Sequence, residues 1–281
     1  MTVGTSDGNN DVAQFYNGTG QVSLAGKLRS MWGGNLHNGY WDDADDTAPP
    51  DVATDRLTDL MITRLDPKPG QRVLDIGCGV GKPATRLLTM NPVHVVGITV
   101  SESQVGQARA RVAEAGLADR AAFEHADAML MPFPDDSFDA AWALESMFHM
   151  PDRDRVLAHT ARVLRRGSRL VLADFVLRPR GSAAGMAVVD QICAEFGVHS
   201  LTTLDAYVEQ LTAHSFTDID ALDISDNIAR TGILLADAME SVRDQLVENG
   251  NDAAVDTMID LTRQFSTTPE FGYVIISATL G

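Results

Sequence analysis

The sequence has little positive charge, few cysteines and no long apolar run. Its 22 Lys and Arg residues stand against 39 Asp and Glu residues, which gives a formal net charge of -17 at pH 7. An electrostatic field of this sign repels phosphate backbones, so we expect no nucleic acid among the partners. No stretch approaches the ~18 apolar residues that a membrane-spanning helix needs, so a membrane partner is not expected either.

Cysteines and targeting signals are scarce as well. The two cysteines, Cys78 and Cys193, cannot build a disulfide framework, and neither belongs to a C-x-x-C pair. The N-terminus has no basic segment followed by an apolar one, the pattern of a secretory signal. These features favour a cytoplasmic protein in a reducing compartment. No metal site is expected, and the composition leaves open whether the chain forms a homo-oligomer.

Short β-rich runs alternate with helical ones along much of the chain. Because strands that alternate with helices indicate a parallel sheet covered on both faces, the expected fold class is α/β. The first five predicted strands are 72–77, 94–100, 121–127, 139–145 and 169–175. Two further strands are predicted at 217–224 and 272–280, among mostly helical stretches at 182–214 and 226–266.

A glycine-rich turn, Asp-Ile-Gly-Cys-Gly-Val-Gly at 75–81, follows the first predicted strand and precedes a helix. An open α/β sheet binds its ligand at this position. The dinucleotide fingerprint G-x-G-x-x-G needs a third glycine where this chain has Lys82, and no acid follows about twenty residues later. A phosphate-binding loop would need glycine at Ile76 and serine or threonine at Pro83. The spacing therefore disfavours both nucleotide classes, including an NAD-dependent oxidoreductase.

Five blocks in a fixed order identify a family. They are VLDIGCGVGKPA (73–84), GITVSESQ (97–104), HADAMLMPFPDDSFD (125–139), ALESMFHMPD (143–152) and ARVLRRGSRLVLADF (161–175). Together they resemble class I S-adenosylmethionine-dependent methyltransferases. More narrowly they resemble the bacterial natural-product tailoring branch that includes the rebeccamycin sugar O-methyltransferase, and more distantly the sterol C-methyltransferases. The resemblance implies a Rossmann-like, mostly parallel seven-stranded sheet with an antiparallel last strand, helices on both faces and helical lid insertions.

The resemblance also divides the chain into four parts of one compact unit. Residues 1–10 are small and polar and are expected to form a disordered tail. Residues 11–66 would be an N-terminal helical cover, with a helix over 51–65. Residues 67–178 would be the cofactor-binding core, and 179–281 would add the remaining strands and the helical lid.

The cofactor implied by the resemblance is S-adenosylmethionine. Its methionyl part would lie at the glycine turn, and its adenine amino group would donate to Asp127. Many relatives hold the ribose with an acid where this chain has Thr99, so Ser101 or Gln104 would supply that contact, although Ser101-x-x-Gln104 is also a helix-capping box. The residues expected to bind the cofactor are Tyr40, Trp41, Asp75, Gly77, Cys78, Gly79, Gly81, Thr99, Ser101, Gln104, Asp127, Ala128, Met129 and Leu144.

The block at 143–152 carries the expected catalytic residues. In rebeccamycin-type relatives this loop has two adjacent histidines, and an aspartate at the end of the next strand completes the site. This sequence keeps the second histidine as His149 and the aspartate as Asp174, but has Phe148 in place of the first histidine. The resemblance implies that His149 acts as a base or orients the acceptor. A histidine in apolar company is otherwise a packing residue, and that alternative stays open.

The expected function is methyl transfer from S-adenosylmethionine to a small, largely apolar specialised metabolite, with oxygen favoured as the methylated atom. C-methylation of an alkene or prenyl group is an alternative, because an aromatic face such as that of Phe148 can stabilise a carbocation. Filling space beside an apolar acceptor explains Phe148 equally well. A cofactor-binding protein that has lost turnover is the second alternative.

Overall fold

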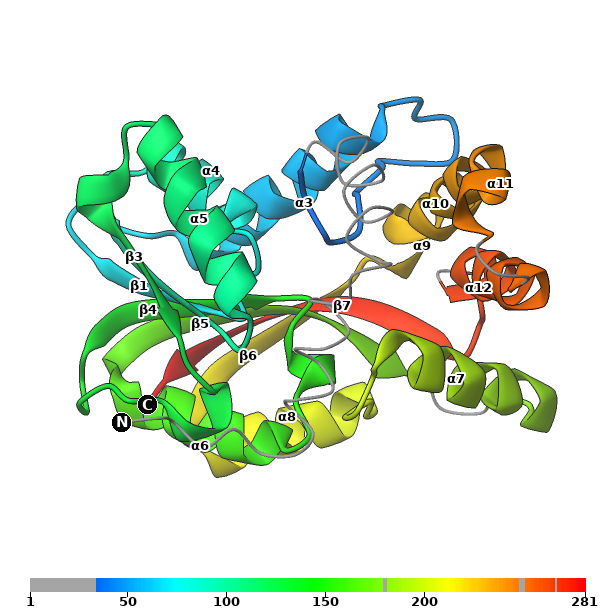
Figure 1. The fold of residues 1–281 in the computed structure, drawn as a ribbon. Helices are drawn as coiled ribbons and strands as arrows, with labels where there is room; N and C mark the ends of the chain where they lie inside the picture. Colours follow the sequence, from blue (N-terminus) through cyan, green and yellow to red (C-terminus); the bar gives the residue numbers. More distant parts are fainter. Residues whose placement is uncertain (1–33, 179–180, 248–250, 266) are drawn as a thin grey trace.

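The chain folds around one seven-stranded sheet (Figure 1). The structure is a computed structural model, and it describes residues 34–178, 181–247, 251–265 and 267–281. The sheet order is β3-β2-β1-β4-β5-β7-β6. The strands are β1 (Arg72–Ile76), β2 (His94–Thr99), β3 (Ala121–His125), β4 (Phe138–Leu144), β5 (Leu164–Leu177), β6 (Phe216–Asp223) and β7 (Phe271–Leu280).

The strand directions confirm the expected fold class. Strands β1 to β5 pair in parallel, and β7 runs antiparallel to both β5 and β6. All seven predicted strands are present, and β5 begins at Leu164, earlier than the predicted 169. The predicted helix over 51–65 is α3 (Pro50–Leu65). The predicted tail at 1–10 and residues 11–33 of the predicted cover lie outside the described residues.

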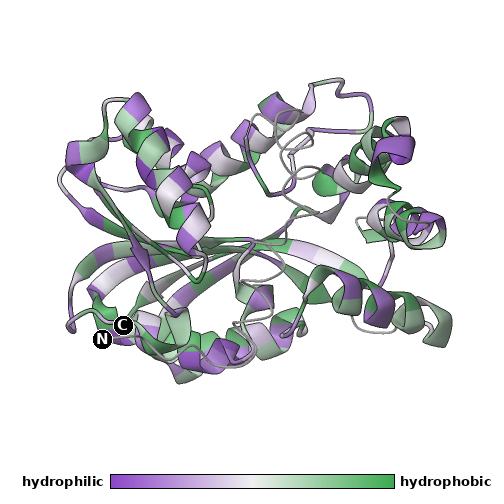
Figure 2. Cartoon of the chain, in the orientation of Figure 1, coloured by the Kyte–Doolittle hydropathy of each residue, from purple (hydrophilic) through white to green (hydrophobic). Residues whose placement is uncertain are grey.

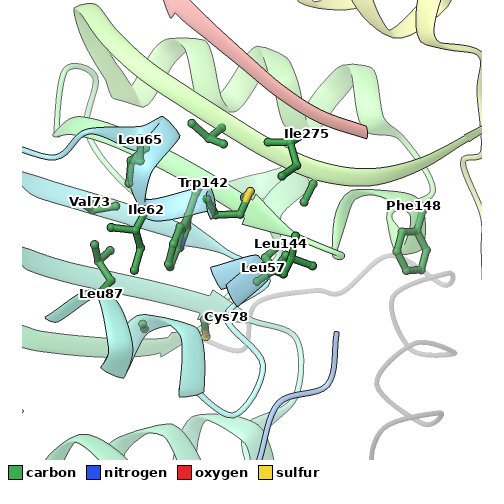
Figure 3. Close-up of a cluster of buried hydrophobic side chains, with 14 of the residues drawn as sticks. Leu57, Ile62, Leu65, Val73, Cys78, Leu87, Trp142, Leu144, Phe148 and Ile275 are labelled. Atoms are coloured by element: carbon green, nitrogen blue, oxygen red, sulfur yellow. The ribbon is translucent and has the colours of Figure 1, made fainter. Parts of the chain in front are cut away.

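Two helical layers cover the sheet and create two apolar cores. Helices α3, α4 (Lys82–Met90) and α5 (Glu102–Glu114) lie on one face, and α6 (Arg153–Val163) and α8 (Leu204–Ala213) on the other (Figure 1). Apolar residues follow the strands between the layers (Figure 2). The first core holds Leu57, Leu87 and Trp142, with Phe148 at its edge (Figure 3). The second core holds Leu157 from α6 and Tyr207 from α8.

The helices predicted as a lid divide between these layers. Helix α8 packs beside α6, because Tyr207 and Leu211 are fully buried in the second core. Helix α7 (Ala183–Phe196) packs against α12 (Asp252–Phe265), and both join the first core. The remaining helices are α9 (Ser225–Ile228), α10 (Arg230–Ser241) and α11 (Arg243–Leu246). Within the described ranges, no helix is both long and apolar enough to cross a membrane.

Candidate active site

A pocket lies at the carboxyl ends of the parallel strands, where an open α/β sheet binds its ligand. Its lining residues are 34–37, 75, 77–80, 82–83, 98–101, 104, 126–128, 144–146 and 149–150. The predicted site residues in this lining are Asp75, Gly77, Cys78, Gly79, Thr99, Ser101, Gln104, Asp127, Ala128, Leu144 and His149. The structure thus brings most of the predicted residues to one place, while their individual roles stay predictions.

The three glycines of the turn after β1 serve different purposes. All have positive φ, 78° at Gly77, 52° at Gly79 and 74° at Gly81, which side chains rarely tolerate. A Cβ at Gly77 would come within 2.3 Å of Ser146, and one at Gly81 within 2.8 Å of a side chain in α5. A Cβ at Gly79 would meet Leu36 at 3.8 Å. Gly77 and Gly81 therefore allow close packing of the protein, whereas Gly79 leaves its space to the pocket.

Two carboxylates present unpaired oxygens at the pocket. Asp127 caps the short helix η2 (Ala128–Leu130), because its Oδ1 accepts from the Met129 N–H at 2.8 Å. Its Oδ2, like Oδ2 of Asp75, is buried without a hydrogen-bond partner among the described residues. Burial raises the pKa of Asp75 to about 7, and the interaction with the Trp142 indole opposes this rise. A buried unpaired acceptor costs roughly 1–3 kcal/mol, and the amino groups of S-adenosylmethionine are donors that would pair such oxygens. The pocket therefore fits that cofactor.

Thr99, Ser101 and Gln104 form one hydrogen-bonded group at the end of β2. The Thr99 hydroxyl donates to the Gln104 side-chain oxygen at 2.7 Å. Ser101 Oγ accepts from the Gln104 N–H at 3.2 Å, so Ser101 is the N-cap of α5, as the capping alternative predicted. All three residues also line the pocket, and their contact with the ribose stays a prediction.

Four residues expected to bind the cofactor, Tyr40, Trp41, Gly81 and Met129, lie outside the pocket lining. Trp41 is 1% exposed, and its indole N–H donates to the Ala48 carbonyl at 2.9 Å. Its backbone N–H donates to the Asn227 carbonyl at 3.0 Å, which ties the segment before α3 to α9. The large apolar area of Trp41 is thus buried inside the protein, and residues 34–37 form the part of the cover that faces the pocket.

His149 lines the pocket at the end of the short helix η3 (Met147–His149). Its Nδ1 lies 2.8 Å from the Gly197 carbonyl oxygen. Because a carbonyl can only accept, Nδ1 carries the proton in the neutral ring and Nε2 is the acceptor nitrogen. Burial lowers the pKa of His149 to about 4, against the opposing effect of the bond to Gly197. The imidazole is therefore neutral near pH 7.

Phe148 and Asp174 do not reach the pocket lining. The Phe148 ring is buried, with its centroid 4.2 Å from that of His149 and 5.6 Å from that of Phe175. Asp174 is fully buried, and its Oδ2 accepts from the Tyr207 hydroxyl at 3.1 Å. Successive side chains of a strand point to opposite faces, so Asp174 faces the layer of α6 and α8 while Phe175 faces Phe148.

Glu145, which follows β4 and lines the pocket, was not among the site residues expected from the sequence. Its Oε1 accepts three hydrogen bonds: from the backbone and side-chain N–H groups of Asn38, both at 2.8 Å, and from the Tyr273 hydroxyl at 2.6 Å. Burial raises the pKa of Glu145, and these donors oppose that rise. Its φ of +51° is a strained value that clusters at functional sites. An acid at the carboxyl end of a central strand was the signal that could have found it.

Known proteins match this arrangement. Residues 73–167 match the family model of a methyltransferase domain. The 27-O-demethylrifamycin SV methyltransferase of Amycolatopsis mediterranei is 42% identical over 263 residues, 93% of this chain and 95% of that protein. The methyltransferase GfsG of Streptomyces halstedii is 38% identical over 271 residues, 95% of this chain and 93% of that protein.

A solved structure with related sequence extends the match to the whole fold. The cyclase SpnF is 31% identical and superposes with a TM-score of 0.79 over 96% of this chain and 95% of its own. The family model and the two curated relatives agree with the five sequence blocks and with the pocket at the glycine turn. The chain therefore belongs to the S-adenosylmethionine-dependent methyltransferases.

Proposed function

We propose that this enzyme methylates a hydroxyl oxygen of a largely apolar specialised metabolite, with His149 as the base that receives the hydroxyl proton. The observation that carries the proposal is the bond from His149 Nδ1 to the Gly197 carbonyl, which makes Nε2 the basic nitrogen of a pocket-lining ring. The relative from Amycolatopsis mediterranei, whose name specifies an O-demethylated acceptor, supports oxygen as the methylated atom.

The lowered pKa of His149 is compatible with this role. When bound, the cofactor supplies a methyl carbon attached to a positively charged sulfur. The hydroxyl oxygen forms a bond to that carbon as the carbon–sulfur bond breaks, and the hydroxyl proton passes to Nε2. Because an oxygen that gains a methyl carbon holds its proton ever more weakly, a base with a pKa of about 4 suffices.

An aromatic group beside His149 supports an apolar acceptor. Phe175 contacts Phe148, Phe265 and Tyr273, with ring centroids 5.6, 4.5 and 4.9 Å away. Phe265 and the half-buried Phe196 bring the group to α12 and α7. Phe148, Phe175 and Tyr273 are buried and lie outside the pocket lining, so only the half-buried rings of Phe196 and Phe265 offer apolar area to a substrate. Aromatic rings can also stabilise positive charge, which keeps C-methylation as the second candidate.

The test compares His149→Ala with His94→Ala, a matched change of an exposed histidine at the start of β2. The probe reaction uses methyl-labelled S-adenosylmethionine and 27-O-demethylrifamycin SV, with a panel of hydroxylated apolar metabolites. We expect His149→Ala to lower turnover about a hundredfold or more while cofactor affinity stays the same. Full activity of His149→Ala would return this residue to a packing role.

The product decides between the candidates. Mass spectrometry that places the label on oxygen supports the proposal, and a label on carbon supports the alternative. The match to a cyclase makes a third outcome informative, namely cofactor binding without label transfer to any acceptor of the panel. That outcome would contradict methyl transfer to this class of acceptor.

A further inference from the structure

Three buried polar side chains form a cluster behind the pocket. Asp174 Oδ2 accepts from the Tyr207 hydroxyl and lies 3.8 Å from the Arg153 guanidinium. The guanidinium carbon stands 4.4 Å from the centroid of the Tyr207 ring. Asp174 and Tyr207 are fully buried, and Arg153 is 4% exposed. Loss of one member would leave buried polar atoms of the others unpaired, which is costly, so the three side chains hold one another in place.

Arg153 connects this cluster to a segment that contacts His149. Its guanidinium donates to the Ser200 carbonyl. Ser200 belongs to the 197–200 segment, which follows α7. The His199 and Ser200 N–H groups both donate to the Phe148 carbonyl, at 2.8 and 3.1 Å. These bonds hold the segment against η3.

The same segment also fixes the orientation of the His149 ring. Its Gly197 carbonyl accepts from His149 Nδ1, and its Ser200 hydroxyl donates to the Met147 carbonyl at 3.0 Å. A continuous path of contacts therefore runs from Asp174 and Tyr207 through Arg153 and the 197–200 segment to the imidazole. Displacement of a reacting group by about 1 Å can lower a rate about a hundredfold, so groups that fix the imidazole affect a rate without touching the acceptor.

We propose that Asp174, Tyr207 and Arg153 are positioning residues that orient His149 through the 197–200 segment. The proposal rests on the proposed function, because it assumes that His149 is the base. It gives Asp174 an indirect role: its carboxylate holds Arg153 and Tyr207 on the face of the sheet opposite Phe175, and does not contact the substrate.

The test begins with Tyr207→Phe, which removes one hydroxyl and keeps the ring over Arg153. Three quantities are measured: turnover with the acceptor of the labelled-methyl assay, KM for that acceptor, and the NMR resonance of the His149 Nδ1 proton, assigned with His149→Gln. We expect turnover to fall about tenfold with KM nearly unchanged, and the His149 resonance to shift. Ser200→Ala, which removes the bond to Met147, should shift the same resonance and serves if Tyr207→Phe does not fold.

Thr160→Val is the matched control. Thr160, on α6, is buried as Tyr207 is. Its hydroxyl donates to the Val156 carbonyl at 2.8 Å, so the change likewise removes one buried hydroxyl. We expect a similar loss of stability with an unchanged His149 resonance and unchanged turnover. If Thr160→Val shifts the resonance and lowers turnover as much as Tyr207→Phe, the effect is general destabilisation and the proposal is wrong.

The two proposals fail in different ways. An unshifted His149 resonance in both Tyr207→Phe and Ser200→Ala, with His149→Ala inactive, overturns the positioning path and leaves the base in place. A shifted resonance in both variants, with His149→Ala fully active, supports the path and overturns the base.

Discussion

The two sides of the pocket use their polar groups differently. On the cofactor side, formed by the glycine turn and the ends of β1 to β3, Asp75 and Asp127 each keep one buried oxygen without a partner in the described structure. On the acceptor side, formed by η3 and the residues that contact it, Glu145 Oε1 accepts three bonds and His149 Nδ1 is paired with Gly197. The difference agrees with the proposal: oxygens lack partners where the cofactor would bind, and the polar groups are paired where the acceptor would bind.

Gly79→Val is the strongest test of the cofactor side. The new side chain would enter the space that Gly79 leaves to the pocket, so we expect cofactor affinity to fall about a hundredfold, which corresponds to the upper part of the roughly 1–3 kcal/mol that overpacking costs. Calorimetric titration with S-adenosylhomocysteine measures it. Gly116→Val is the control, because Gly116 also has positive φ, +70°, and a Cβ added there would meet no atom within 4 Å. Equal losses in the two variants would attribute the effect to backbone strain.

Asp127→Asn should have a smaller effect. The amide oxygen can keep the cap on the Met129 N–H, while the amide nitrogen replaces the unpaired Oδ2 and cannot accept a hydrogen bond. We expect cofactor affinity to fall about ten- to a hundredfold, with turnover nearly unchanged at saturating cofactor. Asp152→Asn, at the N-cap of α6 outside the pocket lining, is the control for cap chemistry. A turnover defect with normal affinity would move Asp127 to the acceptor side.

The two sides are alike in their buried titratable groups. Burial lowers the pKa of two pocket-lining histidines to about 4: His37, in the segment before α3, and His149, on the acceptor side. The cofactor side has Asp75, and Asp174 lies behind the acceptor side; burial raises the pKa of each to about 7. Between about pH 4.5 and 6 the unfolded chain binds more protons at the histidines, so they make stability rise with pH. In the same range the folded chain binds more protons at the aspartates, so they make stability fall with pH. The two contributions oppose each other.

His37→Asn should reveal this balance as the smallest of the expected effects. The variant loses one contribution that rises with pH, so its free energy of unfolding should fall with rising pH by up to about 1.4 kcal/mol per pH unit relative to the unchanged protein. Denaturant unfolding at several values between about pH 4.5 and 6 measures the slope. His94→Asn, a change of an exposed histidine, is the control. Parallel curves for His37→Asn and the unchanged protein would contradict the buried, neutral state of His37.

Much of the fold and part of the site could be predicted from local patterns. Alternation of strands and helices predicted the sheet, and the ordered blocks predicted which loops meet at its carboxyl edge. The roles of Trp41 and Asp174 were harder to place. No strand or glycine pattern follows Trp41 to show whether its side chain faces the pocket or the protein interior. Its hydrogen-bond partner Asn227 lies 186 residues away. For Asp174 the period of two along β5 shows that it faces away from Phe175, but not which face holds the pocket.

The sequence by itself determined the path of the backbone: the strands, the glycine turn and the helix caps such as Ser101 each depend on neighbours a few residues apart. Tertiary structure alone decided which polar atoms pair across the site. The bond from His149 to Gly197 joins residues 48 apart, and the bond from the Tyr273 hydroxyl to Glu145 joins residues 128 apart. The physical reason is that a hydrogen bond tolerates a change of only a few tenths of an ångström in its donor–acceptor distance. That distance is fixed by how whole helices and strands pack against one another.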